Sequence, residues 1–482
     1  MDDLLYVWIY PSGEDKPVLC GMLELLQGRR CVFSYDSSWL ARKGAFPLSP
    51  DIPLGPGVVE PPEGMDIHPV FEDAGPDRWG KNVINKVFNP LRRSHLEYLE
   101  LAGENRIGAL GFSRSGAEYI MEKGASFNVV DLPELIRAAD ALALQMPIDD
   151  DLRRLLRPGS AAGGARPKAA IKHKNSDWIA KFPAESDQYD MCAFEHASLV
   201  LAKLCGVNTV ESELLKVGKQ NVLLVKRFDR EEGRLHFVSA RTMLVADGVV
   251  ESRMGYADLA DVVRRYCSSP EETCHQLFRR MVVNVLIENS DDHERNHGFL
   301  YRDGQWALSP AYDVLPQRQG LGYHHLRIGK DGNMGNIANA LSDCQRFLLK
   351  PAAAELIVSE IFGKMLGWRD VFANEGVSQQ DIKSFEGYVL RDPVFWFGRA
   401  PAKPVPPSGR EYSGRVEAVD AKCVYLEFGR KDVVQLDRTS VYKLLPPNIL
   451  ILPNAELNVK FKEGQMVFAS IKGPEKNLFL AR

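Results

Sequence analysis

Short apolar runs separated by turn residues begin the chain and predict a small β-rich module. The runs Leu4 to Tyr10 and Arg30 to Tyr35 have the length and composition of strands. A proline-rich stretch from Pro47 to Pro62 allows little regular structure. We expect Trp79 to Leu101 to be helical and to pack onto the part of the chain that follows.

The middle of the chain predicts a hairpin, a helix and a further strand. Two apolar runs around a polar turn predict the hairpin over residues 169–181. Apolar side chains at helical spacing predict an amphipathic helix over residues 193–207, and Gly206 is a stop signal near its end. Asn221 to Val225 is a short apolar strand.

The remaining chain changes from helical to strand-like patterns. An apolar helix-like run covers Met281 to Ile287, and we expect helices over Ala352 to Leu366 and Ser378 to Leu390. Residues 399–408 are a proline-rich hinge, expected to be extended. Beyond the hinge, short alternating segments between turn residues predict a small antiparallel barrel or curled sheet.

Composition limits the possible classes of protein. With 482 residues, of which 45% are hydrophobic, the chain can bury substantial cores and form three or four units. The net charge of −4 gives no global case for nucleic acid or an anionic membrane surface. No apolar run reaches the roughly 20 residues that span a bilayer, and the acidic start lacks a signal peptide's basic region. We therefore expect a cytoplasmic protein that does not bind membranes.

Cysteine usage fits that compartment. The eight cysteines include no CxxC pair and show no evident metal spacing. We expect reduced thiols and no zinc site.

The candidate chemistry lies in NSDDHERNHGFLYRDGQWALSPAYD, residues 289–313. Asp291 and Asn296 are five positions apart, the interval between the base and the metal-binding amide in the protein-kinase catalytic loop. A hairpin turning at Asp303-Gly304 would return Asp313 beside Asn296, where the two could share a hard, oxygen-ligated metal. The alternative is a polar loop of hydrogen-bonding side chains after a helix.

Phosphoryl transfer also requires groups that hold the nucleotide, and candidates precede this segment. Small residues and glycines from Gly163 onward allow backbone N–H groups to approach phosphate oxygens. Lys181 ends the predicted hairpin and is our candidate phosphate-binding lysine, with Glu195 as a possible ion-pair partner. The alternatives are a flexible linker, a solvent-facing lysine and a solvated acid at a helix start.

Residues 1 to about 395 resemble the HipA-like serine/threonine kinases of bacterial toxin–antitoxin systems. The motifs that carry the resemblance are WLARKGAFPLSPDIPL (39–54), FEDAGPDRWGKNVI (71–84), NRIGALGF (105–112), GGARPKA (163–169), WIAKFP (178–183), KRFDR (226–230), SDDHERNHGFL (290–300) and LSPAYDV (308–314).

The resemblance implies a role for each matching residue. Asp291 would be the catalytic base, and Asn296 and Asp313 would hold Mg²⁺. ATP would be bound by Asn296 and Asp313 together with Gly163, Gly164, Ala165, Arg166, Lys168, Lys181, Lys226, Arg227, Phe228, His293 and Tyr312. For His293 and Tyr312 a packing role is the alternative. Family members often carry an autophosphorylated serine where this chain has Ala161, so regulation of that kind would depend on the adjacent Ser160.

With the resemblance, the predicted fold is α+β: a two-lobed, protein-kinase-like fold with an N-terminal β-rich module and a small C-terminal all-β domain. The expected division is a β-rich module at 1–110, a small lobe at 111–240, a mainly helical large lobe at 241–398, a linker at 399–408 and a small β domain at 409–482. The last of these resembles the KfrB domain of plasmid-encoded proteins. Its basic residues suggest either a nucleic-acid surface or a solvated face.

The resulting hypothesis is an ATP- and magnesium-dependent protein kinase with a toxin role. The resemblance implies a protein substrate in translation, such as an aminoacyl-tRNA synthetase, a helix-turn-helix antitoxin, and DNA contact through the antitoxin complex. The alternatives are a small-molecule phosphotransferase and a non-catalytic ATP-binding module that acts through partner or DNA contacts.

Overall fold

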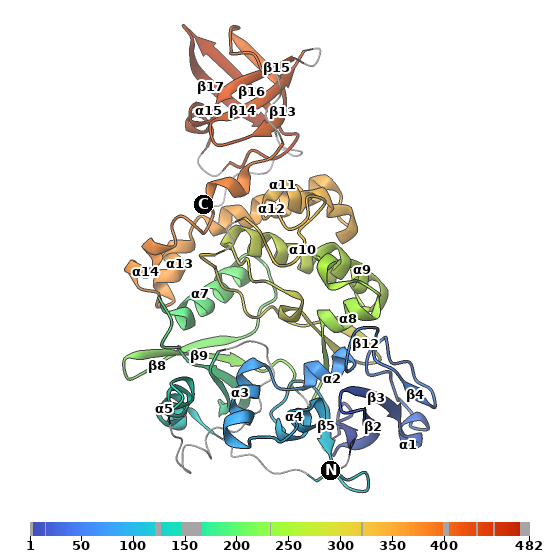
Figure 1. The fold of residues 1–482 in the computed structure, drawn as a ribbon. Coiled ribbons are helices and arrows are strands. Elements are labelled where there is room, and N and C mark those ends of the chain that lie inside the picture. Colours follow the sequence, from blue (N-terminus) through green and yellow to red (C-terminus); the bar gives the residue numbers. More distant parts are fainter. Residues whose placement is uncertain are drawn as a thin grey trace.

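The structure is a computed structural model, and it places the chain's elements along one long axis (Figure 1). The N-terminal sheet and a second sheet lie toward one end, helices fill the middle, and the C-terminal sheet forms the opposite end. The predicted α+β class is therefore confirmed. The residues that the structure describes are 3–14, 16–120, 127–146, 166–231, 233–319, 322–398, 404–429, 432–446 and 449–472.

The N-terminal module is a five-stranded antiparallel sheet in the order β4-β3-β2-β1-β5. Leu5, Val7 and Ile9 of β1 are fully buried. They belong to one hydrophobic core that continues into the helical region of the chain, so the module and that region fold against each other. The elements are β1 (Leu4–Ile9), β2 (Val18–Leu26), β3 (Arg30–Tyr35), β4 (Val58–Val59), β5 (Leu110–Ser113), α1 (Ser37–Leu40), α2 (Pro69–Ala74), α3 (Arg78–Val87) and α4 (His95–Leu101).

A second antiparallel sheet, in the order β6-β7-β9-β8, contains the predicted hairpin. Its register sets Lys168 directly opposite Lys181, so the two side chains project from the same face of the sheet. The elements here are a 3-10 turn (Val129–Asp131), α5 (Leu132–Ala143), β6 (Lys168–His173), β7 (Ser176–Lys181), α7 (Met191–Leu204), β8 (Ser212–Val217) and β9 (Gln220–Lys226).

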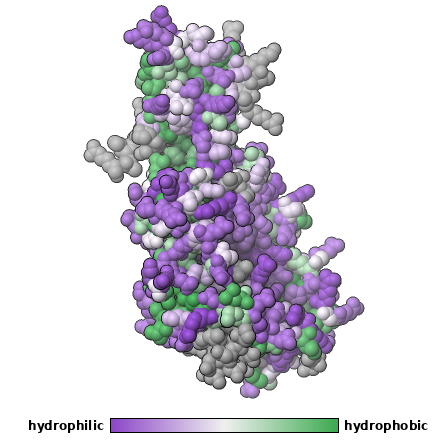
Figure 2. Space-filling view, turned by 60° about the vertical axis from the view of Figure 1, so that its left-hand side comes forward, coloured by the Kyte–Doolittle hydropathy of each residue, from purple (hydrophilic) through white to green (hydrophobic). Residues whose placement is uncertain are grey.

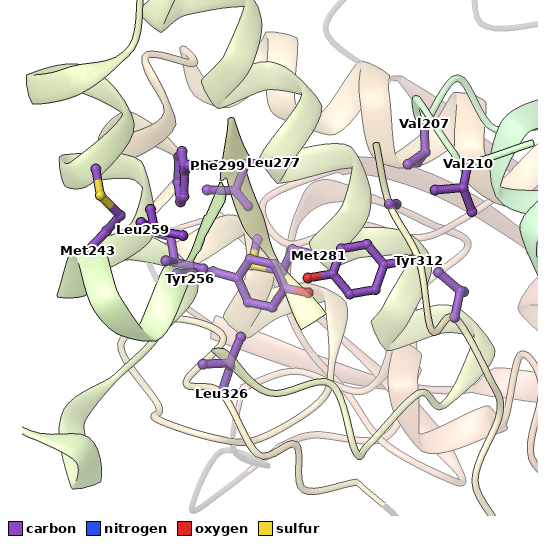
Figure 3. Packing of buried hydrophobic residues seen from close by; sticks show 14 of the residues in the cluster. Val207, Val210, Met243, Tyr256, Leu259, Leu277, Met281, Phe299, Tyr312 and Leu326 are labelled. Atoms are coloured by element: carbon purple, nitrogen blue, oxygen red, sulfur yellow. The ribbon is translucent and has the colours of Figure 1, made fainter. Parts of the chain in front are cut away.

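The helical region surrounds a small sheet in the order β10-β11-β12. Met281 of the long helix α10 lies in a buried cluster with Tyr256, Phe299 and Tyr312 (Figure 3). The elements are β10 (His236–Ser239), α8 (Ala240–Ala246), α9 (Tyr256–Tyr266), α10 (Pro270–Ile287), β11 (Gly298–Arg302), β12 (Gln305–Leu308), α11 (Ile337–Ser342), α12 (Pro351–Met365), α13 (Trp368–Asn374) and α14 (Gln379–Ser384), with 3-10 turns at Glu251–Arg253, Glu294–Asn296, Cys344–Phe347 and Asp392–Phe395.

The C-terminal domain is a five-stranded antiparallel sheet in the order β15-β14-β13-β16-β17 with a hydrophobic core of its own. Figure 2 shows it as a narrow projection from the rest of the molecule. Its elements are β13 (Glu411–Val419), β14 (Cys423–Phe428), β15 (Asp432–Asp437), α15 (Arg438–Leu444), β16 (Glu456–Lys462) and β17 (Gln465–Lys472).

Three sequence predictions need correction. The helix expected over Trp79 to Leu101 is two helices, α3 and α4, because Asn89 adopts a left-handed backbone, Pro90 follows it and Ser94 forms a capping box for α4. The helix expected over Ser378 to Leu390 ends at Ser384, and turns through Gly387 replace its second half. The C-terminal domain is not all-β, because Asp437 caps the short helix α15.

Within the described residues, no helix combines the length and the apolarity that crossing a bilayer requires.

Gly414→Ala is expected to destabilise the C-terminal domain. A Cβ atom at Gly414 would lie 1.8 Å from the backbone oxygen of Glu427 in the neighbouring strand β14, so the two strands must separate, at a cost of about 1 to 3 kcal/mol or more. Thermal unfolding combined with limited proteolysis measures this as cleavage within 404–472 at a lower temperature than in the wild type.

The matched control is Gly363→Ala in α12, where a Cβ meets nothing within 4 Å and stability should rise by about 0.4 to 1 kcal/mol. Equal stability of the Gly414 variant and the wild type would contradict this account of the sheet.

Candidate active site

Three charged side chains from separate elements meet inside the molecule. Lys181 ends β7, Glu195 lies in the N-terminal half of α7, and Asp313 follows the β11–β12 hairpin. The ammonium of Lys181 donates a hydrogen bond to Glu195 Oε1 at 2.6 Å and another to Asp313 Oδ1. The pair between Lys181 and Glu195 was one of two options left by the sequence, whereas the contact between Lys181 and Asp313 was not predicted.

The charges in this triad are unbalanced. Burial alone would lower the pKa of Lys181, but the two carboxylates outweigh it and raise that pKa. Burial opposes ionisation of Asp313, yet the ammonium of Lys181 holds the pKa of this carboxyl below its ordinary value. Burial, helped by the nearby Asp313, raises the pKa of Glu195. With both carboxylates ionised the triad carries a net negative charge, which favours an added cation.

The predicted catalytic loop begins where α10 ends. Glu288 has a left-handed backbone, with φ of 60°, and turns the chain into the loop. Asp291 is exposed, and its carboxylate makes no hydrogen bond to any residue that the structure describes. The adjacent Asp292 is buried, accepts a hydrogen bond from the Tyr256 hydroxyl and lies 3.1 Å from Nε2 of His297. Of the two neighbouring acids, Asp291 is therefore the one available to an incoming group.

Two contacts bring the loop and Asp313 together. The hydroxyl of Tyr312 donates to the backbone oxygen of Arg295 at 2.8 Å, which ties the residue before Asp313 to the residue before Asn296. The side chain of Asn289 also donates to the backbone oxygen of Asp313 at 3.4 Å. The predicted hairpin is confirmed, since β11 and β12 pair through the turn at Asp303-Gly304. Asp313 itself has φ of 53°, a strained value for a residue with a side chain.

Asn296 lies in a 3-10 turn of this loop and is buried. No hydrogen bond from its side-chain amide is found in the described part of the chain, so the group remains available to a ligand. An amide and a carboxylate are hard oxygen donors of the kind that Mg²⁺ accepts, and Mg²⁺ usually keeps several waters and substrate phosphates as its other ligands. The described residues contain no group of three or more His, Cys, Asp and Glu side chains placed to hold a metal.

A small pocket adjoins the triad. Phe228 lies against Tyr312 there, with ring centroids 5.5 Å apart and planes inclined by 22°. The pocket is apolar on its walls and has Lys181 and Asp313 at its edge, which suits a flat heterocycle that carries phosphates. Its lining residues are Asn105, Ile107, Ile179, Lys181, Val225, Lys226, Arg227, Phe228, Asp229, Tyr312 and Asp313.

The remaining predicted residues lie around this pocket with different surroundings. The ammonium of Lys226 contacts Glu211 at the surface, 2.8 Å away. The guanidinium of Arg227 is buried and donates to Asp229 and to backbone oxygens of the N-terminal module. Arg227 therefore lines the pocket, but its guanidinium is already hydrogen-bonded to other residues of the chain.

The described part of the predicted phosphate loop also contacts other parts of the chain. Arg166 pairs with Asp187. Lys168 pairs with Asp77, the N-cap of α3, at 2.5 Å, and the contact is buried. Lys168 is near enough to Asp313 to help lower the pKa of that carboxyl. Gly163, Gly164 and Ala165 lie outside the described residues, as do Ser160 and Ala161.

A histidine that the sequence did not indicate lies beside the loop. His325 Nε2 is 3.4 Å from Glu294, and its ring centroid is 5.8 Å from that of His293. The contact with Glu294 raises the pKa of His325. Burial opposes ionisation of Glu294, but the contact with His325 and the other neighbouring groups lower its pKa to about 2. No sequence signal links these residues, because the whole β11–β12 hairpin separates them.

Two family models match separate parts of the chain. The HipA N-terminal domain matches residues 16–113, and the HipA-like C-terminal domain matches residues 160–368, the part that contains the triad and the loop. The chain belongs to the HipA-like family. This HipA-like chain is 22% identical over 315 residues to the serine/threonine-protein kinase toxin HipA of Shewanella oneidensis, covering 58% of this chain and 69% of that protein.

Two further relatives show how far the similarity extends. Toxin YjjJ of Escherichia coli is 29% identical over 174 residues, which are 33% of the HipA-like chain and only 38% of that toxin. A solved Shewanella oneidensis complex of HipA, HipB and operator DNA matches with a TM-score of 0.60 at 17% identity, covering 79% of this chain and 93% of the matched chain. That likeness establishes a shared fold.

Lys181→Met is expected to lower the free energy of unfolding by about 3 to 5 kcal/mol, because it leaves the buried Glu195 and the partly buried Asp313 without their shared cation. Chemical denaturation measures the loss. The matched control is Lys172→Met on the same hairpin, whose pair with Asp177 is exposed and contributes less than about 1 kcal/mol. Equal losses in the two variants would show that the triad does not support the fold.

The pair of His325 and Glu294 is expected to make stability depend on pH. Since the folded-state pKa of His325 is raised, its contribution is complete below the unfolded pKa of about 6.5 and is lost as pH rises through the higher folded value. Glu294 acts at the acid end, where its contribution is lost as pH falls toward its folded pKa of about 2. His325→Ala should therefore lower stability more at pH 5.5 than at pH 8.5, by about 1 kcal/mol or less because His325 is half exposed. Urea midpoints at the two pH values test this, and a deficit independent of pH would contradict it.

Proposed function

We propose that the chain is an ATP- and magnesium-dependent serine/threonine protein kinase of the HipA toxin type. The observation that carries the proposal is the buried triad of Lys181, Glu195 and Asp313 beside an aromatic pocket and an exposed Asp291. These are the groups that phosphoryl transfer needs: a lysine for phosphates, a helix glutamate that holds the lysine, acidic and amide oxygens for metal, and a base.

Each residue has one task in this proposal. Phe228 and Tyr312 hold the adenine, and Lys181 contacts the phosphates. Asn296 and Asp313 hold Mg²⁺, which neutralises charge on the phosphates when it is bound. The exposed carboxylate of Asp291 accepts the proton of the substrate hydroxyl. Asp292 does not perform this task, since it is buried and its Oδ2 is held by both Tyr256 and His297.

The other nucleotide contacts are proposed from the motif alone or from placement near the pocket. Gly163, Gly164, Ala165, Arg166 and Lys168 form the phosphate loop. Reaching a phosphate would require Lys168 to exchange its contact with Asp77, which would change how the loop meets the N-terminal module. Lys226, Arg227 and His293 complete the proposed contacts.

The biological role is proposed by analogy with the relatives. The Shewanella protein is named a kinase toxin, and its solved structure is a complex with HipB and operator DNA. We propose that this chain likewise is restrained by a helix-turn-helix antitoxin and meets DNA through that complex. Its substrate would be a protein of translation, such as an aminoacyl-tRNA synthetase. We also propose the division into units at 1–110, 111–240, 241–398, 399–408 and 409–482.

Asp291→Asn is expected to lower phosphate transfer by about 10²- to 10⁴-fold, the contribution of a positioned general base. The assay supplies ATP labelled in its γ-phosphate, magnesium and bacterial lysate, and follows label on protein. Asp303→Asn is the matched control, because it makes the same change at a hairpin turn away from the pocket. Protein label with the wild type that disappears with Asp291→Asn supports the kinase.

Two other results would redirect the proposal. Label that appears only on small molecules would identify a small-molecule phosphotransferase. ATP binding with no transfer by the wild type would indicate a non-catalytic binding module.

A further inference from the structure

The predicted catalytic loop is anchored by a fully buried carboxylate. Glu288 ends α10 three positions before Asp291, and its side chain has no solvent exposure. One oxygen accepts the backbone N–H of Gly322 at 2.7 Å, and the other accepts the Nε–H of Arg391. Because Glu288 also holds a left-handed backbone, its side-chain partners help to maintain the turn that begins the loop.

Arg391 connects this anchor to the last residues of the helical region. Its guanidinium also donates to the backbone oxygen of Gly335 at 2.8 Å, so one side chain joins two segments and the loop. The N–H of the preceding Leu390 donates to the backbone oxygen of Leu286 in α10 at 2.8 Å. Leu390 has φ of 53°, which is strained for a leucine. The position of Arg391 is therefore closely set by contacts on both sides.

The C-terminal domain holds the residues that come directly after Arg391. Asp392 forms a two-pronged pair with Arg438 of α15, with both N–O distances 2.6 Å. Phe397 exchanges two backbone hydrogen bonds with Val419 of β13, at 2.9 and 3.0 Å, and its ring lies in the core of the domain. Gly398 approaches β13 so closely that a Cβ would lie 2.6 Å from the backbone oxygen of Glu417. Residues 392–398 are thus bound to the C-terminal domain.

We propose that Arg391 is a positioning residue for Asp291 and that the C-terminal domain controls phosphate transfer through it. The path is short. Arg438 pairs with Asp392, and the preceding residue, Arg391, pairs with Glu288. Glu288 in turn begins the loop that carries Asp291. This inference rests on the proposed kinase function for its effect on rate. A partner that binds the C-terminal domain and disturbs α15 would therefore change catalysis without touching the nucleotide.

The decisive variant is Arg438→Ala in the full chain. We expect kcat for phosphate transfer to fall about 3- to 30-fold, the range of coupling through residues that touch no ligand. The KM for ATP should stay unchanged, since the pocket around Phe228 is not part of the path. The exchanged pair Asp392→Arg with Arg438→Asp should recover most of the lost rate, because it restores the two-pronged contact with its charges reversed.

Arg415→Ala is the matched control. Arg415 pairs with Glu427 at 3.2 Å within the same domain, and both residues belong to its sheet. This variant should therefore match the wild type in kcat. Equal kcat for Arg438→Ala, Arg415→Ala and the wild type, at equal folded fraction by circular dichroism, would overturn the inference and leave the kinase proposal intact. So would a loss that the exchanged pair does not recover.

Hydrogen exchange tests the same path without any enzymatic activity. Backbone amides of residues 288–296 should exchange faster in Arg438→Ala than in Arg415→Ala, because the anchor at Glu288 is loosened. If the wild type transfers no phosphate, the proposed function fails, and this comparison alone decides the inference. Faster exchange then supports the path, and identical exchange in the two variants overturns it.

Discussion

The buried contact of one ammonium with two carboxylates is the constraint on which the arrangement of this molecule depends. Taking three charges out of water is costly, and a single lysine cannot fully compensate two acids. The cluster persists because β7, α7 and the segment after β12 each deliver one of its members. Holding Lys181, Glu195 and Asp313 together therefore holds the second sheet against the helical region. The remaining negative charge is at the edge of the aromatic pocket, where a cation and phosphates would be received.

The segments that meet at this cluster are themselves under backbone strain. Glu288 at the start of the loop and Asp313 beyond the hairpin both have positive φ without being glycine. Such conformations persist only where surrounding contacts determine them. At Glu288 these contacts come from Gly322 and Arg391, and at Asp313 from Lys181 and Asn289. The segment from Glu288 to Asp313 is therefore strained at both of its ends. Within it, the exposed Asp291 lies next to the buried Asp292.

Local patterns in the sequence predicted most elements, and long-range partners were largely hidden from it. The hairpin over 169–181, helix α7 and the β11–β12 hairpin follow from apolar spacing and turn residues, which act over a few positions. The break between α3 and α4 was missed because helical spacing resumes after it. The sequence could nominate Asp291 and Asp313, but it could not show that Lys168 contacts Asp77 or that His325 contacts Glu294. Those contacts depend on how distant elements pack, and a single sequence gives no signal for such pairs.

The C-terminal domain shows why a separate core need not mean an independent unit. Its strands bury their own apolar side chains in a separate core. Ala338 of α11 packs against that core, and Leu452 of the domain belongs to the main core of the molecule. Its junction, however, is made of directional contacts: a two-pronged ion pair at Asp392 and paired backbone hydrogen bonds at Phe397. A hydrogen bond or ion pair of this kind is lost when one of its atoms moves by about 1 Å, whereas apolar contacts tolerate such a shift. Directional contacts therefore couple the positions of the two segments that they join. Arg391, which is adjacent to this junction, forms a buried ion pair with Glu288. The junction and the start of the loop therefore cannot move independently without breaking that pair.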